Sequence, residues 1–224
     1  MGLHLYCITA AEHASLPPGG VQGVEDAPVR SVAYGALAAL VSEHGARPAA
    51  SLAAIRVHNQ VVAGAMDDRC TPVPIRFGQW LDDDAAVRAA LRTDETRWNA
   101  LLRRFAGCAE FAIRIFDPDQ RVQAAQPRPG TGREYMAALA ARRTGPAARQ
   151  AEATAPLRDA LRDVAAAEVV EPLRTPHGVA SVAYLVHRAQ FDAYHTALER
   201  VRTSLPHFRY LSTGPWPPYS FVTE

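Results

Sequence analysis

The sequence predicts an α+β protein of two domains, and three observations carry this prediction. Short apolar runs of strand length alternate with longer amphipathic runs of helix length along all 224 residues. The order of these runs changes near Gly107. A hydrophobic fraction of 48% allows a substantial core, and the length suits one large or two small domains. We therefore expect an N-terminal α+β domain over residues 1–107 and a C-terminal domain over residues 108–224.

The first domain contains both strand and helix patterns. Residues 3–9 form an apolar run typical of a buried strand, and residues 29–34 and 36–42 are expected to form a hairpin, although alanines in the second run also favour a helix. Ser51 is expected to cap the next helix. The remaining elements expected here are a turn at 17–20, helices over 52–67 and 95–105, a strand over 71–78 and a helix opened by Asp82, Asp83 and Asp84.

The second domain shows the order strand, helix, two strands, helix, strand. This order is the split βαββαβ pattern of a ferredoxin-like sheet with its helices on one face. The expected elements are a strand over 109–116, a loop over 117–131, a helical region over 133–167 broken at Gly145–Pro146, strands over 169–174 and 179–187, a helix over 189–204 and a strand over 208–213.

The chain closes with an aromatic and proline-rich tail over residues 214–224, G-P-W-P-P-Y-S-F-V-T-E. Its prolines fix φ near −65° and favour an extended backbone up to Pro218. Burying each of the aromatic side chains Trp216, Tyr219 and Phe221 contributes roughly 1.5–3 kcal/mol. We therefore expect the tail to pack on the protein's own surface, near the junction of the two halves, and to leave part of its aromatic face for a partner. A free arm that binds a partner is the alternative.

Charge and cysteine usage exclude several classes of protein. The formal net charge is +1 with acids and bases interspersed, so the chain lacks the basic field that nucleic-acid binding needs. No stretch approaches about 18 apolar residues and no positive leader opens the chain, so we expect a cytoplasmic protein without membrane insertion. Cys7, Cys70 and Cys108 form no C-x-x-C pair and are expected to be buried.

The sequence contains no recognisable catalytic or metal-binding motif. His58 falls on the apolar face of its helix without a nucleophile motif beside it, which favours a buried structural histidine over a general base. His187 and His195 lack the spacing of metal ligands. The run of three aspartates at 82–84 is typical of a helix N-terminus and less typical of a magnesium site. We therefore expect a protein that is no enzyme and holds no metal or organic cofactor.

The run C-T-P-V-P-I-R-F-G-Q-W at residues 70–80 predicts a surface for a partner. Pro72 and Pro74 cannot donate to a strand ladder, so this run is expected at a sheet edge. An edge that pairs incompletely beside exposed apolar side chains is compatible with a protein interface. The residues expected to bind a partner are Ile75, Arg76, Phe77, Gly78 and Trp80, together with Trp216, Tyr219 and Phe221 of the tail.

Several runs resemble the gas vesicle protein F/L family, in the family's order and over essentially the whole chain. They are L-Y-C-I near the start, H-N-Q-V-V at 58–62, P-V-P-I-R-F-G at 72–78, G-R-E-Y-M at 132–136, A-Y-L-V at 183–186 and the closing T-G-P-W-P-P-Y-S-F-V. Departures are mild: Q-W follows R-F-G where relatives usually carry a small polar or β-branched residue, and the P-P-G-G loop at 17–20 is local to this sequence.

The resemblance implies a non-enzymatic accessory protein of gas vesicles, the hollow protein shells that give microbes buoyancy. It implies contacts with the hydrophobic shell protein and with other accessory proteins, and an α+β domain followed by a modified ferredoxin-like domain. A shell subunit with an apolar surface aggregates unless something covers it before assembly. The alternative, drawn from topology alone, is a small-molecule- or cofactor-binding enzyme of the dimeric α+β barrel type. The sequence leaves open the F or L subtype, the shell-facing surface and the oligomeric state.

Overall fold

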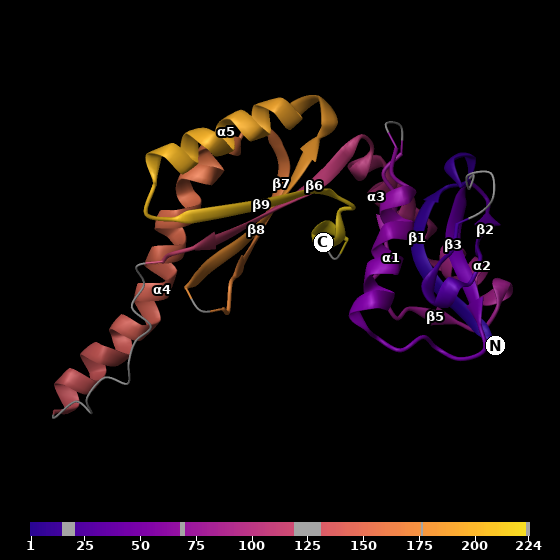
Figure 1. The fold of residues 1–224 in the computed structure, drawn as a ribbon, viewed down its shortest axis with the longest axis horizontal. Coiled ribbons are helices and arrows are strands. Elements are labelled where there is room, and N and C mark those ends of the chain that lie inside the picture. Colours follow the sequence, from indigo (N-terminus) through magenta and orange to yellow (C-terminus); the bar gives the residue numbers. More distant parts are fainter. Residues whose placement is uncertain (15–20, 68–69, 119–130, 176, 223–224) are drawn as a thin grey trace. The chain divides into compact units, whose positions relative to one another are not determined.

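The computed structural model describes residues 1–14, 21–67, 70–118, 131–175 and 177–222, and it describes 132–146 by their backbone alone. The chain divides into two compact units, one of Met1–Glu110 with Pro215–Glu224 and one of Phe111–Gly214. Each unit contains a sheet and helices (Figure 1), so the α+β class is confirmed. The tail contacts the first unit, whereas the sequence grouped it with residues 108–213. The turn expected at 17–20 and most of the loop expected at 117–131 lie outside the described residues.

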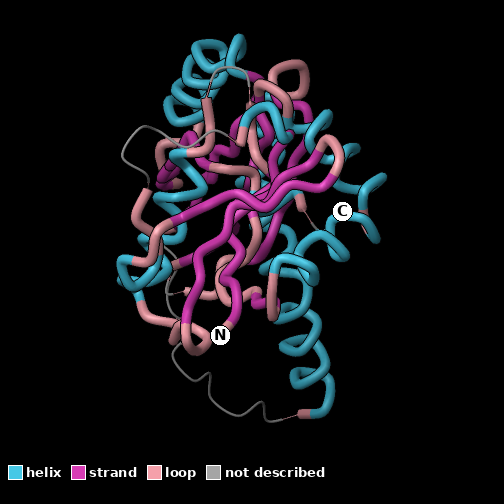
Figure 2. The backbone as a smooth tube through the Cα atoms, turned by 90° about the vertical axis from the view of Figure 1, so that its right-hand side faces the viewer, coloured by secondary structure: helices cyan, strands magenta, loops and turns pink. Residues whose placement is uncertain are grey.

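The sheet of the first unit has the order β2-β3-β1-β4, and β5 also pairs with β1. The expected hairpin is confirmed, because β2 and β3 pair antiparallel from Val29 opposite Ser42 to Tyr34 opposite Leu37. Figure 2 shows the strands of the molecule in magenta. The strands are β1 (Gly2–Ala10), β2 (Val29–Tyr34), β3 (Leu37–His44), β4 (Val73–Pro74) and β5 (Trp80–Leu81).

The helices of the first unit are α1 (Leu52–Gly64), α2 (Asp84–Thr93) and α3 (Glu95–Phe105). The Ser51 side chain accepts a hydrogen bond from the Ala54 N–H, and Asp83 accepts one from the Ala86 N–H. Each cap satisfies a backbone donor that the helix itself leaves free. The expected capping roles of Ser51 and of the aspartate run are therefore confirmed.

The helices of the first unit lie on two faces of its sheet. Leu40 of β3 packs in a buried cluster with Val61 and Val62 of α1. Its neighbour Ala39 points to the opposite face, because successive side chains of a strand alternate. Helices α2 and α3 both contact β3 on that second face, where Ala39 and Leu91 line one cavity.

The second unit has the sheet order β7-β8-β6-β9. Both helices contribute to its core, in which Phe111 stacks on Tyr194 with ring centroids 4.4 Å apart. Leu157 and Leu161 are buried in the same core. The elements are β6 (Cys108–Phe116), α4 (Gly132–Leu161), β7 (Ala165–Pro172), β8 (Gly178–His187), α5 (Phe191–Ser204) and β9 (Arg209–Trp216).

Two expectations for this unit are wrong. The backbone of α4 continues through residues 145–146 without the expected break, since a proline inside a helix removes one backbone donor and kinks the helix without having to end it. Helix α4 ends at Leu161 and not at residue 167. Residues 165–172 pair with β8, and this pairing overrides the helix preference of their alanines.

Candidate partner-binding site of the first unit

Residues 75–79 form a loop that leaves the sheet between two short strands. Cys7 of β1 lies opposite Pro74, and His4 lies opposite Trp80. Two residues of β1 separate these pairs, whereas five residues separate Pro74 from Trp80, so three extra residues leave the ladder. The strand expected over 71–78 is therefore wrong beyond Pro74, because the extra residues cannot stay in register.

Both ends of this loop are held by hydrogen bonds. The Ile75 N–H donates to the Tyr6 carbonyl oxygen over 2.9 Å, and Nε2 of His58 donates to the Ile75 carbonyl oxygen over 2.8 Å. The guanidinium of Arg47 donates to the carbonyl oxygen of Gly78. Gly78 has φ 93°, a conformation that side-chain-bearing residues rarely adopt. The loop is thus anchored to β1, to α1 and to the segment after β3.

A buried pair of histidines lies behind the loop. Because the Ile75 carbonyl accepts from Nε2 of His58, Nδ1 of neutral His58 is an acceptor, and Nε2 of His4 donates to it over 2.9 Å. Nδ1 of His4 is buried and has no hydrogen-bond partner among the described residues. Burial, followed by the neighbouring His58, lowers the pKa of His4 to about 4, and burial lowers the pKa of His58. The expected structural role of His58 agrees with its burial.

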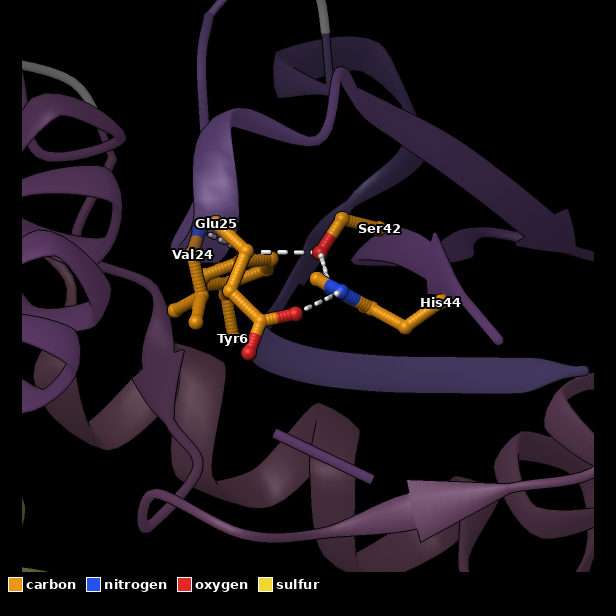
Figure 3. Close-up of polar contacts among 5 residues, drawn as sticks. All are labelled: Tyr6, Val24, Glu25, Ser42 and His44. Carbon is orange, nitrogen blue, oxygen red and sulfur yellow. Dashed lines mark hydrogen bonds and ion pairs between the residues drawn. The ribbon is translucent and has the colours of Figure 1, made fainter. Parts of the chain in front are cut away.

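A second buried hydrogen-bond chain starts at Tyr6, the bulged residue of β1 (Figure 3). The Val24 N–H donates to the Tyr6 hydroxyl over 2.9 Å, and this hydroxyl lies 2.7 Å from Oγ of Ser42. Oγ of Ser42 lies 2.8 Å from Nε2 of His44, whose Nδ1 lies 3.3 Å from Glu25. With Glu25 ionised, the consistent donor order runs from Tyr6 through Ser42 and His44 to Glu25. This chain of hydrogen bonds was not predicted from the sequence.

The tail packs on the first unit through its last turn. Phe221 is fully buried, whereas Trp216 is 49% exposed. The Tyr219 hydroxyl donates to Oδ1 of Asn59 over 2.9 Å. The strand continues through Trp216 and a 3₁₀ turn follows at Tyr219–Phe221, so the extended backbone expected up to Pro218 ends in a turn.

Ser220 and Glu110 join the tail to the start of β6. The Ser220 N–H and hydroxyl donate to the two carboxylate oxygens of Glu110 over 2.9 and 2.8 Å. Burial raises the pKa of Glu110, and the bonds from Ser220 act against that shift. A buried carboxylate with both oxygens bonded is a specific anchor for the tail.

An apolar cavity of about 300 Å³ lies beside the loop. Arg76 is the only charged residue among the described residues that line this cavity. Among the same lining residues, only Trp98 has a buried side-chain nitrogen without a hydrogen-bond partner in the described part of the chain. The carbonyl oxygen of Gln79, another lining residue, accepts from the Leu5 N–H over 3.2 Å. The lining residues are Leu5, Ile8, Ala39, Pro74, Ile75, Arg76, Gln79, Leu81, Val87, Ala90, Leu91, Trp98, Tyr219 and Val222.

The cavity brings together only part of the expected partner site. Ile75, Arg76 and Tyr219 all line it, although the tail is far from the loop in sequence. The other expected residues do not line the cavity. Phe77 packs on His4 and His58, with ring centroids 5.0 and 5.7 Å apart, Gly78 forms the turn of the loop, and Trp80 packs against the backbone of Gly2. In the tail, Trp216 is half exposed and Phe221 is a core residue.

Sequence reasoning missed the wall that α2 contributes. Val87 and Leu91, four residues apart on α2, are buried and line the cavity. That spacing is the apolar stripe of an amphipathic helix and was available as a signal. Trp98 of α3 lines the same cavity.

The described residues contain neither a membrane-spanning helix nor a cluster of metal ligands. No helix in these ranges is both long enough and apolar enough to cross a bilayer. No three His, Cys, Asp or Glu side chains in the same ranges gather as ligands for a metal ion. The three cysteines are buried and free, as expected from the sequence.

Comparisons with known proteins give one consistent result. The family model of the gas vesicle synthesis proteins GvpL/GvpF matches residues 2–223. Gas vesicle protein F of Streptomyces sp. (strain CB03234) is 30% identical, covering 99% of this chain and all of the relative. Gas vesicle protein L of the same strain is 28% identical, covering 98% of this chain and 92% of the relative. The crystal structure of GvpF from Anabaena sp. PCC7120 superposes with a TM-score of 0.83 at 20% identity, over 99% of this chain and 95% of that one, and therefore shows a shared fold.

Proposed function

Since the chain belongs to the family of gas vesicle synthesis proteins GvpL/GvpF, we propose that it acts in gas vesicle formation as a non-enzymatic accessory protein. The match over residues 2–223 is the observation that carries this proposal. In this role the protein binds the hydrophobic shell protein and contacts other accessory proteins. It works in the cytoplasm, at the forming vesicle.

The loop 75–79 beside the cavity is the surface we assign to the shell protein. Support comes from Ile75 and Phe77, apolar side chains of this loop that are only partly buried, and from Arg76, which has no hydrogen-bond or ion-pair partner among the described residues. A partner that brings apolar surface to this place gains from its burial. Trp216, exposed at the start of the tail and outside the cavity lining, is a second apolar side chain that we assign to partner contact.

Three side chains of the first unit resemble a catalytic triad, but their burial and hydrogen bonding favour a binding protein over an enzyme. Ser42, His44 and Glu25 have the residue types of a hydrolytic triad. Ser42 is fully buried, and its oxygen accepts the hydrogen bond of the Tyr6 hydroxyl in the donor order derived above. A nucleophile must reach its substrate, so we assign this chain of hydrogen bonds to the stability of the sheet.

We also infer a ferredoxin-like class for the C-terminal domain, over residues 108–224 with the tail at 214–224. The sequence of elements β6-α4-β7-β8-α5-β9 and the sheet order β7-β8-β6-β9 support this classification. Limited proteolysis tests the expected domain boundary. Cleavage between residues 107 and 111 that releases two folded fragments would support two independent domains. A first fragment that unfolds without residues 215–224 argues against the expected boundary for the tail.

Co-purification from cells that make the shell protein tests the proposed function. We expect a tagged copy of this protein to retain the shell protein, and an unrelated tagged protein of similar size to retain none. Deleting the gene is expected to abolish vesicles, and the wild-type gene supplied on a plasmid is expected to restore them. Normal vesicles in the deletion strain together with no retained shell protein would overturn the proposal.

A further inference from the structure

We propose that the cavity of the first unit binds an aliphatic carboxylate, with the carbon chain among the apolar side chains and the carboxylate at Arg76. This inference concerns a small ligand and stands on the cavity itself, so it goes beyond the proposed contact with the shell protein.

The interior of the cavity suits a carbon chain. Its deeper wall consists of aliphatic side chains that are themselves almost fully buried: Leu5 and Ile8 from β1, and Val87 and Leu91 from α2. A volume of about 300 Å³ lies at the lower end of the range for small-ligand sites. Unfilled apolar space of this size favours an apolar group over water, because the lining offers water few hydrogen bonds.

The polar groups of the cavity select the head group. Arg76 is its only charged lining residue, and no carboxylate of the described residues pairs with it. Two further guanidinium groups lie next to the lining on backbone carbonyls, Arg47 on Gly78 and Arg97 on Val222. A guanidinium binds a carboxylate with two parallel hydrogen bonds, whereas it repels an ammonium group.

Trp98 supplies an independent observation. Its Nε1–H is buried and has no acceptor among the described residues, and the same residue lines the cavity. A buried donor without an acceptor is destabilising, and native structures rarely leave one. A ligand that carries oxygen atoms gives this donor a partner, which an aliphatic chain without a polar head does not.

The tail completes the site. Tyr219 and Val222 line the cavity, and each is fixed by a hydrogen bond, Tyr219 to Asn59 and Val222 from Arg97. The closing residues of the chain therefore form one wall of the ligand site, which gives the tail a role in addition to stability.

Fluorescence of Trp98 tests the inference with decanoate as the probe. The chain has three tryptophans, so Trp80→Phe and Trp216→Phe together leave Trp98 as the only emitter. We expect saturable binding of decanoate, at least tenfold weaker binding of decyltrimethylammonium and of decanol, and no response to butyrate. All titrations stay below the micelle concentration, and native mass spectrometry checks that one ligand binds.

Paired arginine variants test the position of the carboxylate. Arg76→Gln is expected to weaken decanoate binding at least tenfold, and Arg56→Gln, an exposed arginine of α1 that does not line the cavity, is expected to leave it unchanged. Equal affinity for decanoate, decanol and decyltrimethylammonium would overturn the assigned head group. Unchanged decanoate binding by a folded Arg76→Gln variant would overturn the assigned site. No shell protein is present in these titrations, so either failure is separable from a failure of the proposed function.

Discussion

His4 donates a hydrogen bond to His58 across 2.9 Å, and His58 in turn donates to the carbonyl oxygen of Ile75 at the start of the loop 75–79. Both rings are buried, and the bond between them requires neutral His58, because Nδ1 of this ring must be an acceptor. The pair therefore couples the conformation of the loop to the protonation of two side chains that solvent does not reach.

The first prediction is a loss of stability in mild acid. The pKa of His4 is about 4 in the folded protein against 6.5 in the unfolded chain, because burial and the neighbouring His58 disfavour its charged form. The unfolded chain therefore binds the proton first, so this contribution is complete above pH 6.5 and is lost as the pH falls towards 4. At about 1.4 kcal/mol per pKa unit, we expect a loss on the order of 3 kcal/mol by pH 4.

Urea unfolding at a series of pH values measures this effect. All three tryptophans lie in the first unit, so their fluorescence follows the part of the chain that contains His4. His4→Gln is expected to flatten the dependence between pH 6.5 and 4.5, whereas His207→Gln, an exposed histidine of the second unit, is expected to keep it. Glu110 titrates in all these proteins and cancels in the comparison. Parallel curves for wild type and His4→Gln would refute the assignment.

The second prediction concerns the hydroxyl of Tyr6. Tyr6→Phe removes the acceptor of the Val24 N–H and the donor to Ser42 while it keeps the packing of the ring. A buried donor left without a partner destabilises by about 1–3 kcal/mol. Tyr34→Phe serves as the control, because Tyr34 is only partly buried, and it is expected to change the free energy of unfolding by less than about 0.5 kcal/mol. Equal free energies of unfolding for both variants would argue against the hydrogen-bond chain.

The third prediction separates the two roles of the tail. Phe221 is fully buried, so Phe221→Ala is expected to destabilise the first unit by about 3–5 kcal/mol. Trp216 is 49% exposed, so Trp216→Ala is expected to change the thermal midpoint little. Removal of residues 215–224 also removes Phe221, so it should lower the midpoint at least as much as Phe221→Ala does, by about 10 °C or more, which circular dichroism measures. A truncated protein that melts with the wild type would show that the tail contributes nothing to the stability of the unit.

The sequence predicts regular elements well where local signals and packing agree. Helix α3 begins at Glu95 and ends at Phe105, as expected, because an acidic first turn and an apolar stripe both specify it. Ser51 and Asp83 cap their helices as expected, because each side-chain oxygen accepts a hydrogen bond from a backbone N–H of the first turn. The hairpin of β2 and β3 follows from two apolar runs around Gly35, which has φ 56° in the turn.

The site was only partly predictable, because its geometry depends on register. The strand expected over 71–78 would place Phe77 on a face of the sheet, but the three extra residues opposite Leu5 and Tyr6 make a loop in which Phe77 packs on the two histidines. Tyr219 and Leu91 line the same cavity but are far apart in sequence, and no local pattern relates them. The same holds for the chain from Tyr6 to Glu25, since each link joins separate elements.

Binding of purified protein to the shell protein, measured for Arg76→Glu beside Arg56→Glu, tests the proposed partner surface most directly. Both variants reverse the charge of an exposed arginine, but only Arg76 lines the cavity beside the loop 75–79, and neither disturbs the packing of Trp80 on Gly2. We predict that Arg76→Glu weakens binding at least tenfold and that Arg56→Glu binds like wild type. Full-strength binding by a folded Arg76→Glu variant would contradict the assignment of this surface to the shell protein.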